Sequence, residues 1–530
     1  MRFSVAALLL ALSLSFAGCK SDPSTPEHWD KRLADAKGAK GKVKAIEDLR
    51  SSKYMNGKML PMLRKHLEAE KAPEVKGAIA RLLGEQKDKE AVDVLIGSVD
   101  LAGSERADRE MNVEIGRALG EIGDPKGVPT LLKMLGSKDN FTAIEGIEGL
   151  GALKAKEGVQ PLVEMVASES TPNFITKKAI IALGDIGDAK AVPILVKMMF
   201  KERTGVSFYM EASFALYQIG TPAADALIPV LEDKDKELLD WAGKSGIKPV
   251  ALPLKAAQVL GDLHDMRAEK TLLTMLAYKS EFDDIRLLVR MRAADALGRM
   301  RSKEGGKVLA TMLDEGEANV RSQYIKALIR IGTHDAVPKL IDSAGKGSWE
   351  AREEAMIGVA RLGDDKDVAA FEKFAAAEQK LFEAECKEDP DYGPCKDVAG
   401  SVKKHLDRIT ELKKGVDGAK ECKSDPACWA KKLDDKETGV RERAAYEVGR
   451  GGKAELVGEL LKRLGEKNLD ARVAFIQGAD WLIHDSKDAL KLAQKSADDI
   501  KKQIEDERGK NEFVIVNEDL RRLLVKIERG

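Results

Sequence analysis

The chain has 530 residues, of which 33 % are charged, 43 % are hydrophobic and only 5 % are aromatic. Because one hydrophobic core stops growing at about 250–300 residues, the length allows several domains, and the shortage of aromatic residues disfavours a fold built from strands. Lys and Arg number 88 against 89 Asp and Glu, so the net charge is −1. A near-neutral chain lacks the general attraction to phosphate backbones, which argues against a nucleic-acid partner.

The first residues, MRFSVAALLLALSLSFAGC, have the order of a secretory signal peptide. Arg2 precedes an apolar run from Val5 to Leu14, which is too short to span a hydrocarbon core of about 30 Å as a helix of the mature protein. No later apolar run reaches the roughly 18 residues that a membrane span requires. The sequence therefore predicts export without a membrane-spanning helix.

The small residues Ala17–Gly18 stand directly before Cys19, and this order resembles a bacterial lipobox, with Phe16 at the position of its usual Leu. The resemblance implies that residues 1–18 are a lipoprotein signal peptide and that Cys19 carries diacylglycerol and an acyl chain such as palmitate, which together hold a protein at a membrane almost permanently. Lys20 replaces the Asp that retains lipoproteins at the inner membrane, so we expect a bacterial cell-envelope protein, anchored at the periplasmic face of the outer membrane. The alternative is plain secretion after cleavage near Ala17.

A phrase recurs along the chain after a polar, proline-containing segment, residues 19–27, which we interpret as a flexible tether. Residues 118–135 read ALGEIGDPKGVPTLLKML, and residues 182–199 read ALGDIGDAKAVPILVKMM. Weaker copies keep an apolar anchor residue every 31 to 44 positions. The anchors are Leu83, Leu119, Leu150, Leu183, Leu216, Leu260, Leu297, Leu328 and Val359. Such a period predicts stacked structural units.

The residue pattern of this phrase predicts a pair of helices. Ile115, Leu119 and Ile122 have the three- and four-residue spacing of an apolar helix face. Gly123 ends this helix, because glycine accepts the left-handed conformation beyond a C-terminus. Pro129 begins the next helix, where its missing N–H is not needed. Each pair buries its apolar face only by stacking on its neighbours, so the sequence predicts an α-α superhelix.

The phrase resembles the HEAT family, in the short form related to phycobilisome lyases. The resemblance implies an all-α solenoid of stacked antiparallel helix pairs, which we assign to a main array of residues 28–377. Gly120 and Gly184 lie inside the first helices of two repeats, where we expect neighbouring helices to approach closely. Some HEAT-like proteins are bilin lyases, but export would separate this chain from chromophore attachment in the cytoplasm.

Two insertions interrupt the repeat, at residues 200–211 and 233–253. Insertions in repeat arrays form loops that often lie on the binding face. Aromatic residues are favoured anchors of interfaces, so Phe208, Tyr209 and Trp241 are candidate partner-binding residues. The alternative is that these side chains pack over a widened groove.

Four cysteines lie in or near a predicted helical junction, residues 378–422. In an oxidising envelope they indicate disulfides. Three pairings are possible, and the local spacing favours Cys386 with Cys395 and Cys422 with Cys428. A metal site is the alternative, but the spacings do not match zinc knuckles.

A second, shorter array is predicted for residues 423–530. Trp429–Asp435 reads WAKKLDD and echoes Trp29–Asp35, WDKRLAD, at the start of the main array. The array closes with a helix over Glu518–Ile527, whose charged positions suit a solvent-facing cap.

The sequence contains no recognisable catalytic constellation. Neither a nucleophile elbow nor a phosphate-binding loop occurs, and the histidines have no metal-ligand spacing. His264 and His334 fall at turn positions of the repeat, where we expect solvated side chains. The histidines are His28, His66, His264, His334, His405 and His484. We therefore expect no catalytic, cofactor-binding or metal site, and no enzyme.

The array and the anchor together predict a non-catalytic protein-binding scaffold that is lipid-anchored in the cell envelope, with unidentified protein partners. Two alternatives remain. The groove of the solenoid could hold the pocket of an envelope enzyme or small-ligand carrier, or the chain could be a structural spacer.

Overall fold

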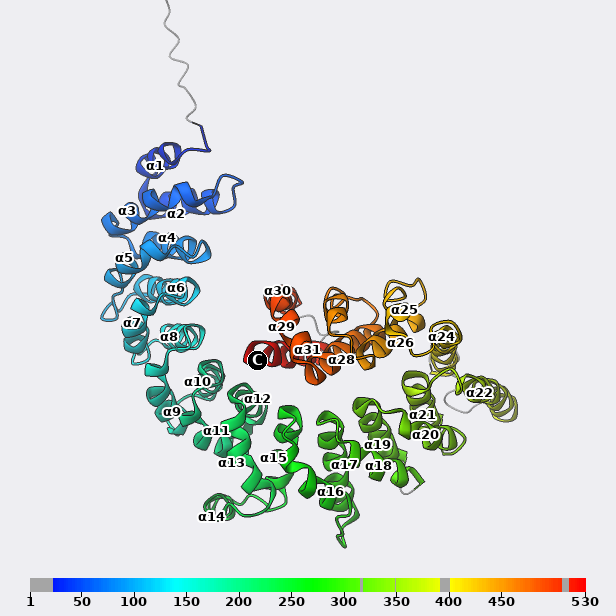
Figure 1. Ribbon diagram of the computed structural model, residues 1–530. Coiled ribbons are helices and arrows are strands. Elements are labelled where there is room, and N and C mark those ends of the chain that lie inside the picture. The colour runs from blue at the N-terminus through cyan, green and yellow to red at the C-terminus, as the bar shows by residue number, and fades with distance from the viewer. Residues whose placement is uncertain (1–21, 315–317, 348, 391–400, 508–513) are drawn as a thin grey trace, which may run out of the picture. The chain divides into compact units, whose positions relative to one another are not determined.

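The computed structural model describes residues 22–314, 318–347, 349–390, 401–507 and 514–530 (Figure 1). This part of the chain consists of helices and turns, with a single hairpin of two short strands. The chain thus has the predicted all-α architecture of stacked antiparallel helix pairs. No helix among the described residues combines the length and the apolar character needed to cross a bilayer.

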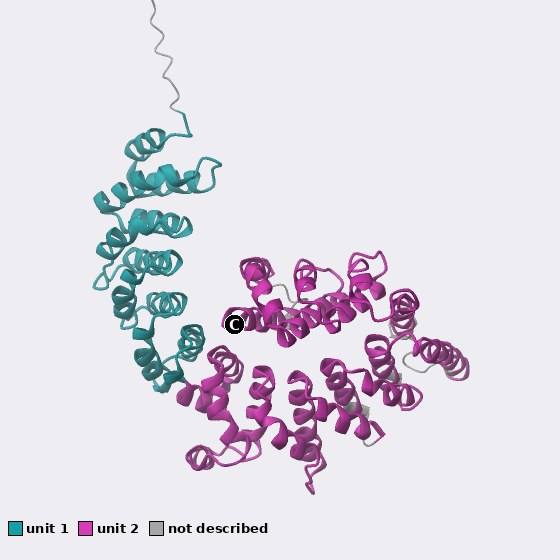
Figure 2. Cartoon of the chain, viewed as in Figure 1, with its two compact units in different colours: residues 1–191 teal, residues 192–530 magenta. Residues whose placement is uncertain are grey.

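Contacts divide the chain into two compact units, residues 1–191 and 192–530 (Figure 2). Unit 1 contains the helices of the first repeats. Its α-helices are α1 (Pro26–Asp35), α2 (Gly38–Arg50), α3 (Leu60–Ala69), α4 (Pro73–Glu85), α5 (Val92–Gly97), α6 (Arg106–Ile122), α7 (Val128–Met134), α8 (Asn140–Ala152), α9 (Val159–Ala167) and α10 (Asn173–Ile186). Its 3-10 turns are η1 (Gly57–Met59), η2 (Lys89–Ala91), η3 (Pro125–Gly127), η4 (Lys156–Gly158) and η5 (Ala189–Ala191).

Unit 2 contains the remaining repeats of the main array, the junction and the second array. The main-array elements are α11 (Val192–Met198), β1 (Glu202–Arg203), β2 (Val206–Ser207), α12 (Tyr209–Ile219), α13 (Thr221–Leu231), α14 (Lys236–Lys244), α15 (Ala251–Leu263), η6 (Met266–Ala268), α16 (Glu269–Leu276), α17 (Asp283–Arg299), α18 (Lys303–Thr311), η7 (Met312–Asp314), α19 (Ala318–Ile331), η8 (His334–Ala336), α20 (Val337–Ser343) and α21 (Trp349–Leu362). The junction consists of α22 (Val368–Glu388) and α24 (Ser401–Cys422).

The second array follows the junction within unit 2. Its elements are α25 (Pro426–Ala430), α26 (Thr438–Arg450), η9 (Ala454–Leu456), α27 (Val457–Leu461), α28 (Leu469–Asp485), α29 (Lys487–Ala493), η10 (Gln494–Ser496), α30 (Ala497–Asp506) and α31 (Val514–Arg529). The unit boundary lies inside the predicted main array, residues 28–377, and the second array shares unit 2 with the later main-array repeats. Helices distant in sequence thus pack together in this unit.

A repeat consists of a first helix that carries the anchor residue, a turn, and a second helix. The predicted anchor residues are all buried, from Leu83 to Val359. Gly120 confirms the expected close approach, because a Cβ atom added there would lie 3.1 Å from Cα of Gly149 on the neighbouring first helix. The first helices therefore form one packed layer, and in unit 1 this layer is α4, α6, α8 and α10.

In eight of the nine repeats with a predicted anchor, a left-handed residue follows the anchor by four positions, at the end of the first helix. Gly123 has this role as predicted, with φ +72°, and the 3-10 turn η3 and α7, with Pro129 in its first turn, follow. Some repeats place a side chain other than glycine here, although this conformation costs L-residues free energy. The left-handed residues are Lys87, Gly123, Lys154, Gly187, Gly220, His264, Arg301 and Gly332.

The second array repeats the opening of the main array in structure as well as in sequence. The indole Nε1 of Trp29 donates a hydrogen bond to the carbonyl of Pro23 at 2.8 Å. The indole Nε1 of Trp429 donates equivalently to the carbonyl of Lys423 at 2.7 Å, again six residues earlier. Both indoles are buried, so the predicted echo of these two phrases reflects the same local fold.

The left-handed residues make a stability prediction possible. Lys154 is exposed and has φ +50°. We expect Lys154→Gly to raise the free energy of unfolding by roughly 0.5–1 kcal/mol, because glycine adopts this conformation without steric cost. Urea unfolding followed by circular dichroism measures the change. Lys138→Gly, at an exposed residue with ordinary φ, is the matched control, and an equal gain there would contradict the explanation.

Candidate functional site

The second array packs against the C-terminal ends of the main-array first helices in unit 2. Arg529 Nη1 of α31 donates to the carbonyl of Tyr217 at 2.7 Å, in the last turn of α12. Trp481 Nε1 of α28 donates to the carbonyl of Arg330 at 2.9 Å, in the last turn of α19. Arg450 Nη1 of α26 donates to the carbonyl of Leu362 at 2.8 Å, the last residue of α21. Carbonyls in the last turn of a helix lack partners within it, and the negative end of the helix dipole attracts cations.

Arg443 of α26 is the most deeply buried of these contacts. Its guanidinium donates to the carbonyls of Ala360 and Gly363 at the end of α21, and it also pairs with Glu447 on its own helix. Burial lowers the pKa of Arg443 to about 10, and Glu447 opposes this shift. The side chain therefore remains a cation at neutral pH, and it binds two carbonyls that water does not reach.

The predicted terminal cap has a different role from the one that its sequence indicated. Helix α31 contains the predicted segment Glu518–Ile527, but some of its charged side chains contact the main array instead of solvent. Arg522 Nε lies 3.4 Å from a carboxylate oxygen of Asp262 on α15. The guanidinium of Arg521 lies 4.4 Å from the ring centroid of Phe214 on α12. Helix α31 thus joins the two arrays.

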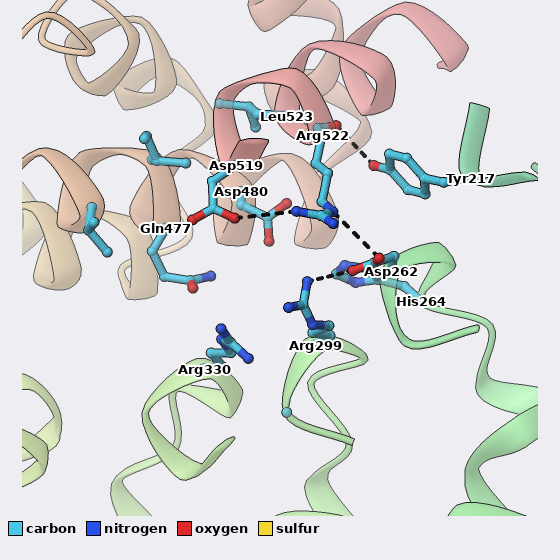
Figure 3. Close-up of a pocket in the computed structure, with 13 residues that line it drawn as sticks. Tyr217, Asp262, His264, Arg299, Arg330, Gln477, Asp480, Asp519, Arg522 and Leu523 are labelled. Atoms are coloured by element: carbon cyan, nitrogen blue, oxygen red, sulfur yellow. Dashed lines mark hydrogen bonds and ion pairs between the residues drawn. The ribbon is translucent and has the colours of Figure 1, made fainter. Parts of the chain in front are cut away.

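A cavity of about 140 Å³ lies between the arrays, where α28 and α31 face α12, α15, α17 and α19 (Figure 3). Its charged groups are arranged as ion pairs. Arg299 and Asp262 are 2.5 Å apart, Arg522 and Asp519 are 3.8 Å apart, and Lys526 and Asp480 are 2.7 Å apart. The lining residues are Tyr217, Asp262, His264, Gly298, Arg299, Arg330, Val473, Ile476, Gln477, Asp480, Asp519, Arg522 and Leu523.

Two histidines distant in sequence meet beside this cavity. The rings of His264 and His484 lie 4.8 Å apart between centroids. Burial lowers the pKa of His264 to about 3, and the nearby Lys526 contributes to this shift. Burial also lowers the pKa of His484. The expectation of a solvated turn for His264 is therefore wrong, because α28 covers its ring, although its left-handed turn position is the one expected.

The pKa values of two aspartates that line the cavity, Asp480 and Asp519, are shifted in opposite directions. Burial alone would raise the pKa of Asp480, but Lys526 and His264 lower it to about 2. Burial raises the pKa of Asp519, although the nearby Arg299, Arg330 and Arg522 oppose this shift. Most of the charged groups that line the cavity are thus engaged in ion pairs within their own array, and the pair of Arg522 with Asp262 joins the two arrays.

The first insertion packs within the main array. Residues 200–211 contain the β1–β2 hairpin, in which Glu202 pairs with Ser207 and Arg203 with Val206. Phe208 is 0 % exposed, which corrects its interpretation as a partner-binding residue, because a buried ring offers no surface. The half-buried Tyr209 donates from its hydroxyl to Gln258 on α15 at 2.5 Å.

A lysine fastens the hairpin to α15. Lys255 Nζ lies 4.7 Å from the ring centroid of Tyr209 and 5.4 Å from that of Phe200, and it donates to the carbonyl of Met199 at 2.7 Å. Cation–π contacts of this kind stabilise the packing.

For Phe208 the alternative prediction, that the side chain packs within the array, is correct. Residues 233–253 contain α14 rather than a simple loop, and Trp241 on α14 is half-buried. Tyr209 and Trp241 stay predictions as partner contacts.

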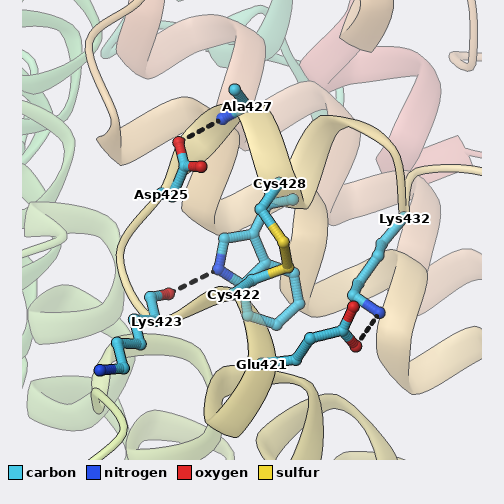
Figure 4. Close-up of a disulfide and its surroundings, with 8 residues drawn as sticks. Glu421, Cys422, Lys423, Asp425, Ala427, Cys428 and Lys432 are labelled. Atoms are coloured by element: carbon cyan, nitrogen blue, oxygen red, sulfur yellow. Dashed lines mark hydrogen bonds and ion pairs between the residues drawn. A yellow bond between two sulfur atoms is a disulfide. The ribbon is translucent and has the colours of Figure 1, made fainter.

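A disulfide joins Cys422 at the end of α24 to Cys428 in α25, as the local spacing predicted, with 5.4 Å between the Cα atoms (Figure 4). It closes the turn that also positions Trp429. Cys386 is disulfide-bonded, but Cys395 lies outside the described residues, so their pairing stays a prediction. Cys19 also lies outside the described residues.

The junction contains a buried histidine, His405, whose sequence context does not distinguish it from the other histidines of the chain. His405 on α24 is 2 % exposed, and its Nδ1 lies 2.5 Å from the Glu353 carboxylate of α21. Its Nε2 lies 3.2 Å from Glu378 on α22, which Arg352 also contacts at 2.9 Å. Burial lowers the pKa of His405, but the hydrogen bonds to the two carboxylates outweigh this effect and raise the pKa to about 8.

His334 lies in a turn and is half-exposed, in agreement with the sequence reading. Its Nε2 lies 2.8 Å from Asp367 and 3.5 Å from Asp364, in the corresponding turn of the next repeat. The side-chain oxygen of Asp367 also accepts a hydrogen bond from the backbone N–H of Asp364 at 2.8 Å. These three side chains could approach one metal ion, but their hydrogen bonds already serve to connect two turns.

The layer of first helices in unit 1 carries charges and two prominent aromatic rings. Ion pairs run from helix to helix across this layer. The pairs are Arg81–Glu114 at 2.9 Å, Arg117–Glu145 at 2.7 Å, and Lys178–Glu148. Phe141 on α8 and Phe174 on α10 occupy the same repeat position, nine residues before their anchors, and they are 69 % and 50 % exposed. Large exposed apolar side chains at a repeated position distinguish this layer from an ordinary solvated surface.

Comparison with protein families identifies the repeat. Residues 100–177 match HEAT repeats, and residues 177–200 match the PBS lyase HEAT-like repeat. The chain contains HEAT repeats. Curated proteins give no match.

Several solved structures are similar to this HEAT-repeat chain. Yeast importin-beta (Kap95p) is 11 % identical, with 92 % of this chain and 72 % of that chain covered and a TM-score of 0.45. The karyopherin Kap121p bound to Nup53p is 11 % identical, with 95 % and 70 % covered and a TM-score of 0.46. Human deoxyhypusine hydroxylase in complex with glycerol is 20 % identical, with 58 % and 95 % covered and a TM-score of 0.21. At these identities the similarity assigns no partner or activity to the chain.

Trp481 is 0 % exposed at the contact between the two arrays, so replacing it should lower the stability of both sides of that contact. Trp481→Ala should destabilise unit 2 by roughly 3–5 kcal/mol, because it leaves a large cavity. Trp481→Phe should cost about 1 kcal/mol through the lost hydrogen bond to Arg330. Hydrogen exchange, measured by mass spectrometry, should become faster at the end of α19 as well as in α28. Trp241→Ala, at the half-buried tryptophan of α14, is the control, and unchanged exchange in α19 would refute the coupling.

The raised pKa of His405 predicts that the stability of the fold depends on pH. Because its folded pKa is raised from 6.5 to about 8, its contribution to stability is fully present below pH 6.5 and is lost as the pH rises through 8. The shift corresponds to about 2 kcal/mol. Urea unfolding of the wild type at pH 6 and pH 9 should show this loss, and His405→Gln should be less sensitive to pH over the same interval. An equal pH dependence in both proteins would exclude His405 as its source.

Proposed function

We propose that this HEAT-repeat protein is a non-catalytic scaffold that binds protein partners while lipid on Cys19 holds it in the bacterial cell envelope. The observation that carries the binding role is the pair of exposed rings, Phe141 and Phe174, at one repeated position of the unit 1 first-helix layer. Repeat proteins use the extended surfaces of their stacked helices for binding, and aromatic residues dominate the energetics of interfaces. A surface of this kind suits a protein partner better than a small molecule, which prefers an enclosed apolar pocket.

The anchor rests on the sequence. The order of Arg2, a short apolar run, small residues and Cys19 supports removal of residues 1–18 and lipidation of Cys19. Lys20 supports sorting to the periplasmic face of the outer membrane. The disulfide between Cys422 and Cys428 suits an oxidising compartment. Helix α1 begins at Pro26, inside the predicted tether of residues 19–27, so the tether would be shorter and would leave the folded repeats close to the membrane surface.

The experiment is crosslinking in intact cells from a photo-reactive amino acid placed at residue 141 or 174, followed by mass spectrometry. We expect one defined envelope protein to be captured from both positions. Placement at residue 282, where the wild-type Phe is 68 % exposed in unit 2, is the control and should not capture it. If residues 141 and 174 capture nothing above this control, the binding role is wrong.

Fractionation of the cells that produce the protein tests the lipid anchor. Cys19→Ala should move the protein from the membrane fraction to the soluble fraction, and the wild-type N-terminal peptide should have the mass of a lipidated Cys19. An unmodified N-terminal peptide in the membrane-free fraction of the wild type would show that the protein is secreted without lipid. The crosslinking and the fractionation fail independently, because the first reports the surface and the second reports the anchor.

A further inference from the structure

We propose that His264 and His484 make the docking of the second array on the main array sensitive to acid, so that the two arrays separate as the pH falls from 7 toward 5. Both arrays belong to unit 2, and this switch operates without a partner. It is therefore independent of the proposed scaffold function, and either can be wrong without the other.

The two histidines come from different arrays and meet where these arrays dock. His264 is the left-handed residue at the end of α15 in the main array, and His484 lies in the last turn of α28 in the second array. Their ring centroids lie 4.8 Å apart. A change in the charge of either ring therefore acts directly on the contact between the arrays.

The second array covers a position that the repeat by itself leaves in solvent. The equivalent left-handed residues Lys87 and Lys154 are exposed, whereas His264 is half-buried. The guanidinium of Arg301, the equivalent residue of the next repeat, lies 5.3 Å from the ring centroid of Trp481 on α28. Separation of the arrays would thus return the ring of His264 to water.

The docked structure gives His264 no acceptor for a second proton on its buried side. The Nδ1 atom is buried and has no hydrogen-bond partner among the described residues. The neutral imidazole avoids a buried donor by carrying its proton on Nε2, whereas an imidazolium carries protons on both nitrogens. An N–H group that is buried without an acceptor costs free energy, and this cost exists only while the arrays are docked.

The carboxylates beside the two rings already pair with cations. Asp480 of α28 lies 2.7 Å from Lys526 Nζ of α31, and Asp485 lies 2.7 Å from Arg301. A protonated imidazole would therefore add a positive charge next to Lys526 and Arg301, where the carboxylates are already neutralised. Like charges at such short range repel one another, so protonation disfavours docking.

The cavity side of His264 is balanced in the same way (Figure 3). Asp262 of α15 lies 2.5 Å from Arg299 of α17 and 3.4 Å from Arg522 of α31. Asp519 of α31 lies 3.8 Å from Arg522. The remaining titratable groups on this side are Tyr217, whose hydroxyl donates to the carbonyl of Arg522, and Arg330, which pairs with Asp295. Among the described residues, this side thus offers an imidazolium no unpaired carboxylate.

The pKa values of both histidines agree with this arrangement. Burial and the nearby Lys526 lower the pKa of His264 to about 3 in the docked state, and burial lowers the pKa of His484. An imidazole in water has a pKa of about 6.5. The separated state therefore binds more protons than the docked state, and docking weakens as the pH falls below about 6.5. At pH 5 the effect of His264 alone amounts to roughly thirtyfold in the docking equilibrium constant.

The junction between the arrays responds to acid in the opposite direction. His405 on α24 contacts Glu353 of α21 and Glu378 of α22, and its pKa is raised to about 8. Its contribution to stability is fully present below pH 6.5. Acid thus weakens the docking while the junction keeps this contribution, so we expect separation about an intact junction instead of general unfolding.

The test is hydrogen exchange of the purified full-length protein at pH 7 and pH 5, measured by mass spectrometry and divided by the intrinsic exchange rate at each pH. In the wild type, the protection factors of α28 and α31 should fall by roughly tenfold to thirtyfold, because separation removes the support of the main array. The protection factors of α4 in unit 1 should stay nearly constant. The quantity compared is the ratio of the protection factors at the two pH values, in which a uniform loss of protection cancels.

Substitutions of the two histidines identify the source of the change. His264→Gly should remove most of the fall in protection, and it should fold, because glycine occupies this repeat position at Gly123 and Gly187. His264→Asn should behave in the same way, because asparagine also tolerates the left-handed conformation and does not titrate. His484→Gln should remove a smaller part, because His484 is exposed. His334→Gln, at a half-exposed histidine in another turn of unit 2, is the control and should keep the full wild-type response.

Three results would overturn the proposal. One is constant protection of α28 and α31 between pH 7 and pH 5 in the wild type. Another is an equal fall in the wild type and in both His264 variants, which would assign the response to other groups. The third is an equal fall in α4, because this would show acid unfolding of the whole chain and not the separation of two arrays.

Discussion

Backbone carbonyls at the ends of helices are the constraint on which the arrangement of unit 2 depends. A helix leaves its last carbonyls without partners, and a repeat array places many such ends in register along one edge. Arg443, Arg450, Trp481 and Arg529 of the second array donate to carbonyls at the ends of α12, α19 and α21. The second array therefore docks on a row of equivalent acceptors that the repeat itself creates.

Because the second array docks here, several polar residues of unit 2 contact the other array instead of solvent. Charged side chains on α31 that suit a solvent-facing cap instead pair with Asp262 and cover Phe214. His264 ends a helix in a left-handed conformation, as glycine does in other repeats, yet its ring is covered by the second array. Buried ion pairs are weak contributors to stability because desolvation opposes them, so the pair of Arg522 with Asp262 adds little to the free energy with which the two arrays dock.

Unit 1 carries the same kind of first helices but exposes Phe141, Phe174 and Ile181 on them. In unit 2, Arg521 of α31 covers Phe214, which stands two residues before its anchor. In unit 1, Ile181 holds the equivalent position and stays exposed, as do the rings of Phe141 and Phe174. The proposed lipid on Cys19 would hold this surface at a membrane.

Sequence patterns alone predict the repeat: the anchors, the left-handed Gly123, the proline at the start of the second helix and, as the favoured one of three pairings, the disulfide of Cys422 with Cys428. These features depend on neighbours in the chain or on a period of about one repeat, so a pattern of residue types reveals them. Packing between distant segments sets the burial of Phe208, the place of His405 between Glu353 and Glu378, and the contact of α31 with α12. Those contacts join residues far apart in sequence, and a buried arginine or histidine in them has the same local pattern as a solvated one.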